Sequence, residues 1–251
     1  MNTVLQTFGL NKRFGGIAAT QDVSFALERG ARHALIGPNG AGKTTLINLL
    51  TGVLAPTSGR IELDGRDITR LPVHQRARLG LVRTFQINQL FPALTPLETV
   101  AIAVAERRNI GMRMWRALTD RSDVTDEAAA LLQQFHLGDV MQQPTHALPY
   151  GKRRLLEITI ALAAQPRVLL LDEPVAGVPD SDREEILDTV ARLPADVTVL
   201  LIEHDMDLVF SFARRISVLV NGALFVEGPT ADIARDPRVR AVYLGEEVIH
   251  D

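Results

Sequence analysis

Short runs of alternating apolar and polar residues dominate the first third of the chain. A period of two is typical of β-strands that bury one face. The strands expected on this basis cover residues 23–27, 31–36 and 79–85, with a hairpin over residues 60–68. Residues 44–52 carry apolar side chains at helical spacing and end at Gly52, a residue that commonly terminates helices. This part of the chain therefore predicts strands joined by turns, with one helix directly after a glycine-rich segment.

The middle of the chain, about residues 87–161, has a different pattern. It is rich in Ala, Leu, Arg and Gln, shows few strand signals and is interrupted by prolines. We expect several helices here, one of them over residues 126–135. The basic segment 107–116, which includes Trp115, either contacts a membrane protein or lipid headgroups or forms a solvated helical face.

The final third returns to alternating strands and helices. Expected strands cover residues 168–171, 197–202 and 216–220, and expected helices cover residues 182–193 and 206–212. Because these strands are apolar throughout, both of their faces should be buried, as in a parallel sheet covered by helices on each side. The pattern predicts a single α/β domain over residues 1–251. Its core comprises about residues 1–86 and 162–251, and its helical insertion comprises about residues 87–161.

Composition narrows the class of protein. The chain has 251 residues, 46% of them hydrophobic, and a formal net charge of −3, which argues against nucleic acid held on a broad basic surface. It contains no cysteine, so disulfides and thiolate metal sites are excluded. No run approaches the roughly 18 apolar residues of a membrane-spanning helix, and the first residues lack the apolar region of a signal peptide. We expect a soluble, cytoplasmic protein without a nucleic-acid partner.

A glycine-rich loop between the strand 31–36 and the helix 44–52 carries the strongest chemical signal. It has the phosphate-binding pattern Gly-x-x-x-x-Gly-Lys-Thr, in which backbone N–H groups and a helix N-terminus face the phosphates. The same residues could form an ordinary glycine turn, but such a match arises by chance in about one chain in a hundred. The pattern predicts a site for ATP and Mg²⁺. Its expected ATP-binding residues are Gly37, Pro38, Asn39, Gly40, Ala41, Gly42, Lys43, Thr44 and Thr45.

Polar residues that follow two later strands complete the predicted site. Asp172 and Glu173 end the apolar run 168–171, and His204 follows the run 197–202. Carboxyl ends of parallel strands meet at the sheet edge where ligands bind, so Asp172 can hold Mg²⁺ and Glu173 can polarise the attacking water. Acidic pairs also end strands simply because the chain reaches the surface there. After a phosphate-binding loop, the catalytic interpretation is favoured for Glu173 and His204.

Together these residues resemble the ATP-binding subunits of ATP-binding cassette (ABC) transporters over nearly the whole chain. The resemblance implies a P-loop NTPase (RecA-like) core with an N-terminal antiparallel β subdomain and an inserted helical subdomain. It implies that Phe14 stacks on adenine, although a core phenylalanine would fit the same position. It also implies that Gln86 approaches Mg²⁺ beside Thr44 and Asp172, and that His204 contacts the γ-phosphate.

The signature segment departs from the family pattern Leu-Ser-Gly-Gly-Gln. The residues in its place are Leu148, Pro149, Tyr150, Gly151 and Lys152. In the family this segment caps the nucleotide of a partner subunit, and Pro149 lacks both the hydroxyl and the N–H. We expect the N–H groups of Tyr150 and Gly151 to remain available at a helix start, with Lys152 and Arg153 adding charge. Because Pro179 also changes the face that meets a partner, the resemblance favours a heterodimer with a second ATP-binding subunit.

Further motifs resemble the branched-chain (hydrophobic) amino acid uptake subfamily. They lie at residues 12–16, 83–86, 90–95 and 239–246. This likeness implies an ATPase that powers import with two membrane permeases and, indirectly, a substrate-binding protein, at the cytoplasmic face of the inner (plasma) membrane. The same type of subunit serves urea, amide and aromatic-acid importers. One alternative is a non-transport ABC ATPase, although such proteins usually carry tandem nucleotide domains or long coiled-coil insertions, and the sequence shows neither. The other is a regulatory subunit that only binds ATP, which Pro149 suggests.

Overall fold

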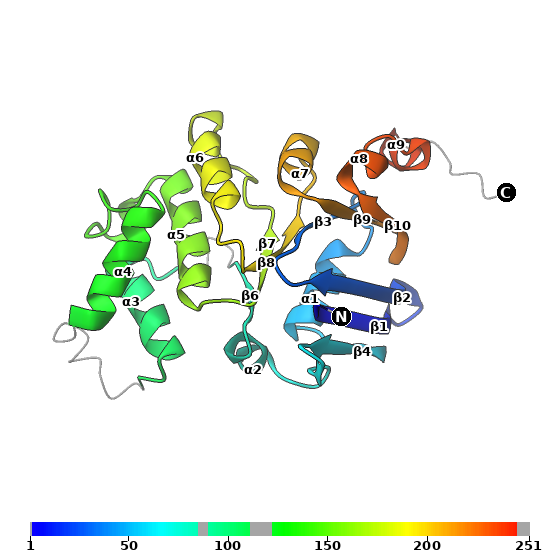
Figure 1. Cartoon of the computed structure of the whole chain (residues 1–251), viewed down its shortest axis with the longest axis horizontal. Helices are drawn as coiled ribbons and strands as arrows, with labels where there is room; N and C mark the ends of the chain where they lie inside the picture. Colours follow the sequence, from blue (N-terminus) through cyan, green and yellow to red (C-terminus); the bar gives the residue numbers. More distant parts are fainter. Residues whose placement is uncertain (1, 85–89, 111–121, 245–251) are drawn as a thin grey trace.

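A six-stranded sheet crosses the centre of the molecule (Figure 1). The computed structural model describes residues 2–84, 90–110 and 122–244. The strand order is β10-β9-β3-β8-β7-β6, parallel throughout except for β10, which is antiparallel to β9. These strands are β3 (Arg32–Ile36), β6 (Leu81–Arg83), β7 (Val168–Asp172), β8 (Thr198–Ile202), β9 (Arg215–Val220) and β10 (Ala223–Pro229).

A second, antiparallel sheet packs near the first and encloses helix α1 (Lys43–Thr51) between them. Its order is β2-β1-β4-β5, with β1 (Thr3–Phe14), β2 (Ile17–Glu28), β4 (Ser58–Leu63) and β5 (Arg66–Asp67). Alternate residues of the central strands separate two cores. Leu35 and Leu170 pack with α1, whereas Ala34 and Leu169 pack with the helices on the opposite face. The prediction of a largely parallel sheet buried on both faces is confirmed, with two differences: β10 is antiparallel, and the second sheet joins α1 in covering one face.

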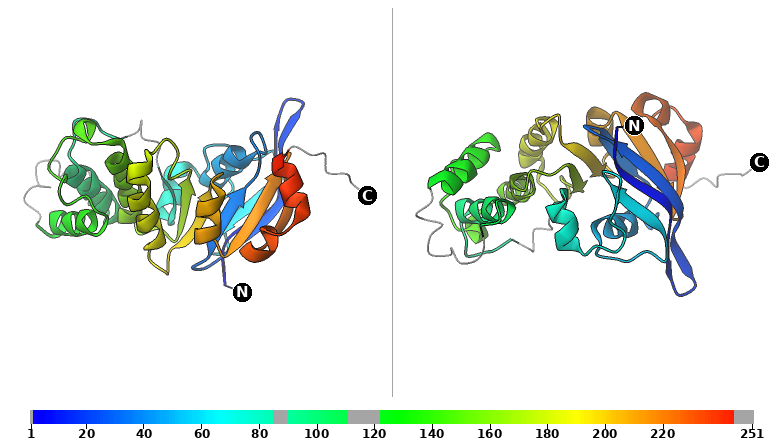
Figure 2. Two further views of the ribbon diagram at one scale, coloured as in Figure 1. Left: turned by 90° about the horizontal axis from the view of Figure 1, so that it is seen from above. Right: turned by 60° about the horizontal axis from the view of Figure 1, so that its bottom comes forward.

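Three helices, α3 (Pro96–Arg107), α4 (Ser122–Gln134) and α5 (Tyr150–Ala163), lie together at one end of the molecule. The hairpin of β1 and β2 lies at the other end in every view (Figure 2). The remaining helices are α2 (Val73–Arg78), η3 (Thr145–Ala147), α6 (Asp180–Ala191), α7 (Met206–Phe212), α8 (Thr230–Ile233) and α9 (Pro237–Leu244). Within the described ranges, no helix is long and apolar enough to cross a membrane.

Most expected elements form, and the differences have local causes. The strand expected at 79–85 is described only as Leu81–Arg83, and Gly80 before it has a left-handed φ of +95°. The pattern did not predict β1, whose register shifts around Gly9 break the period of two. It also missed β10, although Asn221 and Gly222 form the turn before it with positive φ values of 49° and 80°.

Arg76 of α2 is a buried structural arginine, only 1% exposed. Its guanidinium donates to the carbonyls of Leu49 and Leu50 at 2.7 and 2.6 Å, and to those of Thr69 and Leu71 at 2.9 Å each. The first pair lies at the C-terminal end of α1, where carbonyls lack helical partners. Arg76 therefore fastens the far end of this helix to the loop before α2.

His33 of β3 is a buried titratable group, 1% exposed. Its Nε2 lies 2.8 Å from Oγ of Ser217, which in turn donates to Oε2 of Glu227 at 2.8 Å. Burial lowers the pKa of His33 from 6.5 to about 4, even though the nearby Glu227 carboxylate acts in the opposite direction. The folded protein therefore holds this imidazole neutral at mildly acidic pH.

This burial makes stability depend on pH. Below pH 6.5 the unfolded chain takes up a proton on His33 that the folded protein excludes until about pH 4. The contribution of His33 to the free energy of unfolding is therefore fully present above pH 6.5. It falls by about 3 kcal/mol as the pH is lowered towards 4. We expect the free energy of unfolding, measured by denaturant titration, to fall less between pH 7 and pH 4.5 for His33→Gln than for the wild type. Equal decreases for the two proteins would contradict this assignment.

Candidate active site

The predicted site residues follow neighbouring strands of the central sheet. The glycine loop follows β3, His204 lies two residues after β8, Asp172 ends β7, and Glu173 comes directly after it. Strands β3, β8 and β7 are adjacent and parallel, so their carboxyl ends lie side by side. The topology therefore brings together residues that are far apart in the sequence. Gln86 lies outside the described residues, as does most of the segment 107–116.

A cleft of about 480 Å³ opens at this edge of the sheet. It is lined by residues 39–45 of the glycine loop and by Glu173. Residues 17–19 and Gln21 of β2 form another wall, and Asn221 and Gly222 of the β9–β10 turn complete it. The cleft thus joins the predicted phosphate-binding loop and the predicted catalytic carboxylate in one space.

Close backbone contacts require glycine in this loop. A Cβ atom on Gly42 would lie 2.5 Å from the carbonyl oxygen of Ala19, and one on Gly37 would lie 2.2 Å from that of Leu219. Gly42 also has a φ of +97°, a conformation that disfavours other residues. The amide of Gly222 donates to the carbonyl of Ala41 at 2.9 Å. The loop is therefore held closely against β2 and the β9–β10 turn.

Lys43 begins α1 and lies within this loop. Its ammonium donates to the carbonyls of Gly37 at 2.6 Å and Pro38 at 3.2 Å. Burial lowers the pKa of Lys43, while the carboxylates of Glu173 and Asp172 raise it. Because the first N–H groups of a helix have no helical partners, the start of α1 adds donors beside this cation.

Glu173 has an unusual backbone for a residue other than glycine, with a φ of +47°. Its amide donates to the carbonyl of Ile202 on β8 at 2.9 Å. Its side chain is 46% exposed, and Oε1 lies 3.7 Å from Nδ1 of His204. The structure therefore brings Glu173 and His204 together beside the loop, which is compatible with a shared role at a phosphate group.

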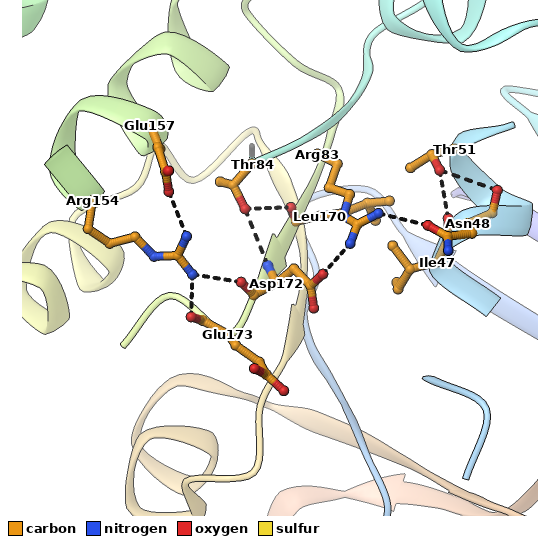
Figure 3. Close-up of polar contacts among 10 residues, drawn as sticks. All are labelled: Ile47, Asn48, Thr51, Arg83, Thr84, Arg154, Glu157, Leu170, Asp172 and Glu173. Atoms are coloured by element: carbon orange, nitrogen blue, oxygen red, sulfur yellow. Dashed lines mark hydrogen bonds and ion pairs between the residues drawn. The ribbon is translucent and has the colours of Figure 1, made fainter. Parts of the chain in front are cut away.

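Asp172 forms an ion pair with Arg83 of β6 (Figure 3). Arg83 also donates to Oδ1 of Asn48 on α1 at 2.9 Å, so it connects Asp172 to the helix that starts with Lys43 and Thr44. The Thr44 hydroxyl and the Asp172 carboxylate are hard oxygen donors of the kind that Mg²⁺ prefers. In the part of the chain that the structure describes, no group of three or more His, Asp or Glu residues could hold a metal ion alone. The donor set fits an ion that is shared with phosphates.

Buried charged residues behind Asp172 and Glu173 were not predicted. Arg154 of α5 is 7% exposed and contacts backbone carbonyls of this turn, and its neighbour Glu157 is fully buried (Figure 3). Glu203, also fully buried, accepts from the amides of His204 at 2.9 Å and Asp205 at 3.2 Å. Burial raises the pKa of Glu203, while hydrogen bonds from the amides of His204 and Val175 lower it. A charged residue directly after an apolar strand is the signal that could have indicated Glu203.

Phe14 lies at the end of β1, beside the β1–β2 turn, and its side chain is exposed. The ammonium of Lys12 lies 5.1 Å from the ring centroid. Ile17, rather than Phe14, lines the cleft. The ring is accessible to a ligand from outside this cleft, so adenine stacking by Phe14 stays a prediction.

The signature segment lies at the start of α5, and among the described residues none of its members lines the cleft. Leu148 is buried, and the Tyr150 hydroxyl donates to the carbonyl of Ala176 at 3.0 Å. The ammonium of Lys152 donates to the carbonyl of His136 at 2.6 Å and to Glu185 at 3.0 Å. We expected Lys152 to add positive charge at the helix start. In the structure the carboxylate of Glu185 offsets that charge.

Known proteins share this sequence pattern. Residues 20–176 match the family described as ABC transporter, and residues 224–249 match the family described as Branched-chain amino acid ATP-binding cassette transporter. The chain is 39% identical over 252 residues to the high-affinity branched-chain amino acid transport ATP-binding protein BraF of Pseudomonas aeruginosa, covering 97% of this chain and 98% of BraF. It is 38% identical over 250 residues to LivG of Escherichia coli (strain K12), which has the same description, with the same coverage.

Solved structures show the same fold. A nucleotide-free ATP-binding cassette from an ABC transporter superimposes with a TM-score of 0.84 at 30% identity, covering 97% of this chain and 100% of the other. The ADP conformation of the cassette MJ1267 superimposes with a TM-score of 0.83 at 31% identity, covering 98% of this chain and 100% of the other. The expected P-loop core, N-terminal β subdomain and helical part are confirmed at the level of fold.

The close contact at Gly42 gives a testable prediction. Gly42→Ala should lower the affinity for ATP at least about tenfold, because its Cβ would displace the loop from Ala19. Titration with a fluorescent ATP analogue would measure this change. Gly65→Ala is the matched control, since Gly65 has a similar φ of +75° but no atom within 4 Å of an added Cβ. Equal affinities for Gly42→Ala and Gly65→Ala would contradict the role of this contact.

Proposed function

The chain belongs to the ABC transporter family, and we propose that it binds and hydrolyses ATP to power an importer for branched-chain or other hydrophobic amino acids. The main observation in support of ATP hydrolysis is that the glycine loop and Glu173 line the same cleft. The descriptions of BraF and LivG, together with the match over residues 224–249, support the cargo class.

In this proposal the glycine loop and the start of α1 bind the phosphates of ATP. Their N–H groups form a concave surface for negative charge. Lys43 leaves the carbonyls of Gly37 and Pro38 and places its ammonium at the β- and γ-phosphates. Thr44, Asp172 and Gln86 hold Mg²⁺, which when bound neutralises developing charge on the phosphates. Phe14 stacks on the adenine ring from the edge of the β subdomain.

Hydrolysis is assigned to the residues at the ends of β7 and β8. Glu173 polarises the water that attacks the γ-phosphate, and its exposed carboxylate at the cleft is available for this task. His204, whose Nδ1 lies 3.7 Å from Oε1 of Glu173, contacts the same phosphate. The fully buried Glu203 holds the amides of His204 and Asp205 and so fixes this loop.

The second half of the site comes from another subunit. The signature segment, residues 148–152, meets the partner's nucleotide through the N–H groups of Tyr150 and Gly151 at the start of α5. Pro149 supplies no N–H or hydroxyl, which favours a heterodimer with a different ATP-binding subunit. Two permeases dock near residues 86–98, and a substrate-binding protein delivers the cargo. The chain then acts as a peripheral subunit at the cytoplasmic face of the inner (plasma) membrane.

Replacement of Glu173 tests the ATPase assignment. In the reconstituted complex, Glu173→Gln should lower ATP turnover at least about a hundredfold while ATP binding persists, because the amide is a much poorer proton acceptor than the carboxylate. Steady-state phosphate release and nucleotide titration measure the two quantities. Glu106→Gln makes the same change at a surface ion pair with Arg78 and should leave both unchanged. Near-wild-type turnover of Glu173→Gln would reject this carboxylate as the catalytic group.

Stimulation by cargo tests the transport assignment. In the complete complex with its binding protein, leucine, isoleucine or valine should stimulate ATP hydrolysis several-fold, because closure of the ATPase subunits is coupled to loaded binding protein. Urea, short amides and aromatic acids serve as the comparison set. Stimulation by one of these compounds, with no response to the branched-chain amino acids, would replace the proposed cargo with that class.

A further inference from the structure

Arg154 holds the backbone of the turn that carries the proposed catalytic carboxylate. Its Nη2 donates to the carbonyls of Asp172, at 2.9 Å, and Glu173 (Figure 3). Its Nε donates to the carbonyl of Pro174 at 2.9 Å. The guanidinium is planar and rigid, so donors on one side chain fix three successive peptide groups relative to one another. The direction of the Glu173 side chain follows from those peptides.

The backbone at Glu173 needs such support. With a φ of +47°, this residue occupies a conformation that side chains other than glycine rarely adopt, and surrounding contacts must maintain it. Its amide is held by the carbonyl of Ile202, and its carbonyl is held by the amide of Ala176 and by Arg154. The contacts from Ile202 and Ala176 are made by backbone groups, whereas Arg154 contacts Glu173 through its side chain.

Glu157 orients the guanidinium from one turn further along α5. Its Oε2 accepts from Nη1 of Arg154 at 2.6 Å, and both side chains are buried. Within the described part of the chain, the other carboxylate oxygen of Glu157 has no hydrogen-bond partner. Burial raises the pKa of Glu157 to about 7, against the effect of Arg154. A buried ion pair with an unpaired oxygen contributes little to stability. The orientation of Arg154 is therefore the better explanation for the presence of Glu157 in the core.

The first residues of α5 also contact the chain that follows Pro174. The Tyr150 hydroxyl donates to the carbonyl of Ala176, and a Cβ atom on Gly151 would lie 2.6 Å from Asp182 of α6. Arg154 lies about one helical turn after Tyr150. Helix α5 therefore contacts the chain from Asp172 to Asp182 while its N-terminus forms the signature segment.

We propose that Arg154 is a positioning residue that sets the direction of Glu173, and that α5 thereby links the segment facing the partner's nucleotide to hydrolysis in this chain's own cleft. This inference rests on the proposed function, in which Glu173 acts on the attacking water. A shift of α5 when the signature segment meets the partner's nucleotide moves Arg154 and with it the peptides of residues 172–174.

Arg154→Met tests this role in the assembled transporter. It keeps an unbranched side chain of similar length but removes the donors to the turn. We expect kcat for ATP hydrolysis to fall at least about tenfold, with KM and the affinity for ATP within about twofold of the wild type. Arg154→Lys retains one donor group and should recover part of the loss. A loss confined to KM, or no loss in kcat, would overturn the proposal.

Arg76→Met is the matched control for a purely structural effect. Arg76 is another buried arginine that donates to successive and neighbouring carbonyls, but at the far end of α1 from the cleft. It should lower the thermal midpoint while kcat, measured well below that midpoint, stays within about twofold of the wild type. If both arginine variants reduce kcat equally at matched folded fractions, Arg154 has no specific positioning role.

A double variant separates this inference from the proposed function. If Arg154 acts only through Glu173, Arg154→Met should cause no further loss of single-turnover rate in the Glu173→Gln protein. An additional loss of the same size as in the wild-type background would show that Arg154 acts elsewhere. If Glu173→Gln itself retains wild-type turnover, the assignment of the catalytic carboxylate fails whatever Arg154 does.

Discussion

The parallel pairing of β3, β8 and β7 is the constraint on which the site depends. Each strand delivers its chemical residues at its carboxyl end, and adjacency of the strands places those ends side by side. The glycine loop and Glu173 can then share one cleft although about half the chain separates them. A shift in the register of β7 by one residue would exchange Asp172 and Glu173 between the faces of the sheet and remove that arrangement.

Two backbone positions beside the cleft have left-handed conformations, and the chain maintains them in different ways. Gly42 adopts its φ without steric penalty, and the tight approach of Ala19 leaves no room for a side chain. Glu173 cannot be glycine if its carboxylate is to act, so its conformation is maintained by partners on both of its peptide groups. The proposed role of the buried Arg154 and Glu157 meets that requirement, since Arg154 holds the Glu173 carbonyl and Glu157 orients Arg154.

Local patterns were sufficient to predict most strands and the positions of the glycine loop, Asp172 and Glu173 at strand ends, because each of these features has a signal within a few neighbouring residues. They were insufficient for β1, whose irregular register hides its alternation, and for Arg154, whose backbone partners are carbonyls 18 to 20 residues away. The partners of Lys152 were missed for the same reason, since His136 and Glu185 come from other parts of the chain. The roles of Gln86 and Phe14 stay predictions from resemblance.

In the proposed function, the position of the signature segment makes this chain depend on a second subunit. Among the described residues, the cleft is lined by the glycine loop, β2, the β9–β10 turn and Glu173, and residues 148–152 contribute nothing to it. The start of α5, which follows Pro149, does not line this cleft, and in the proposed function it meets a nucleotide bound to another subunit. Since the same helix holds the backbone of Glu173 through Arg154, its first two turns serve different sites. In the proposed function, α5 is the element that connects the segment facing the partner's nucleotide to the backbone of Glu173.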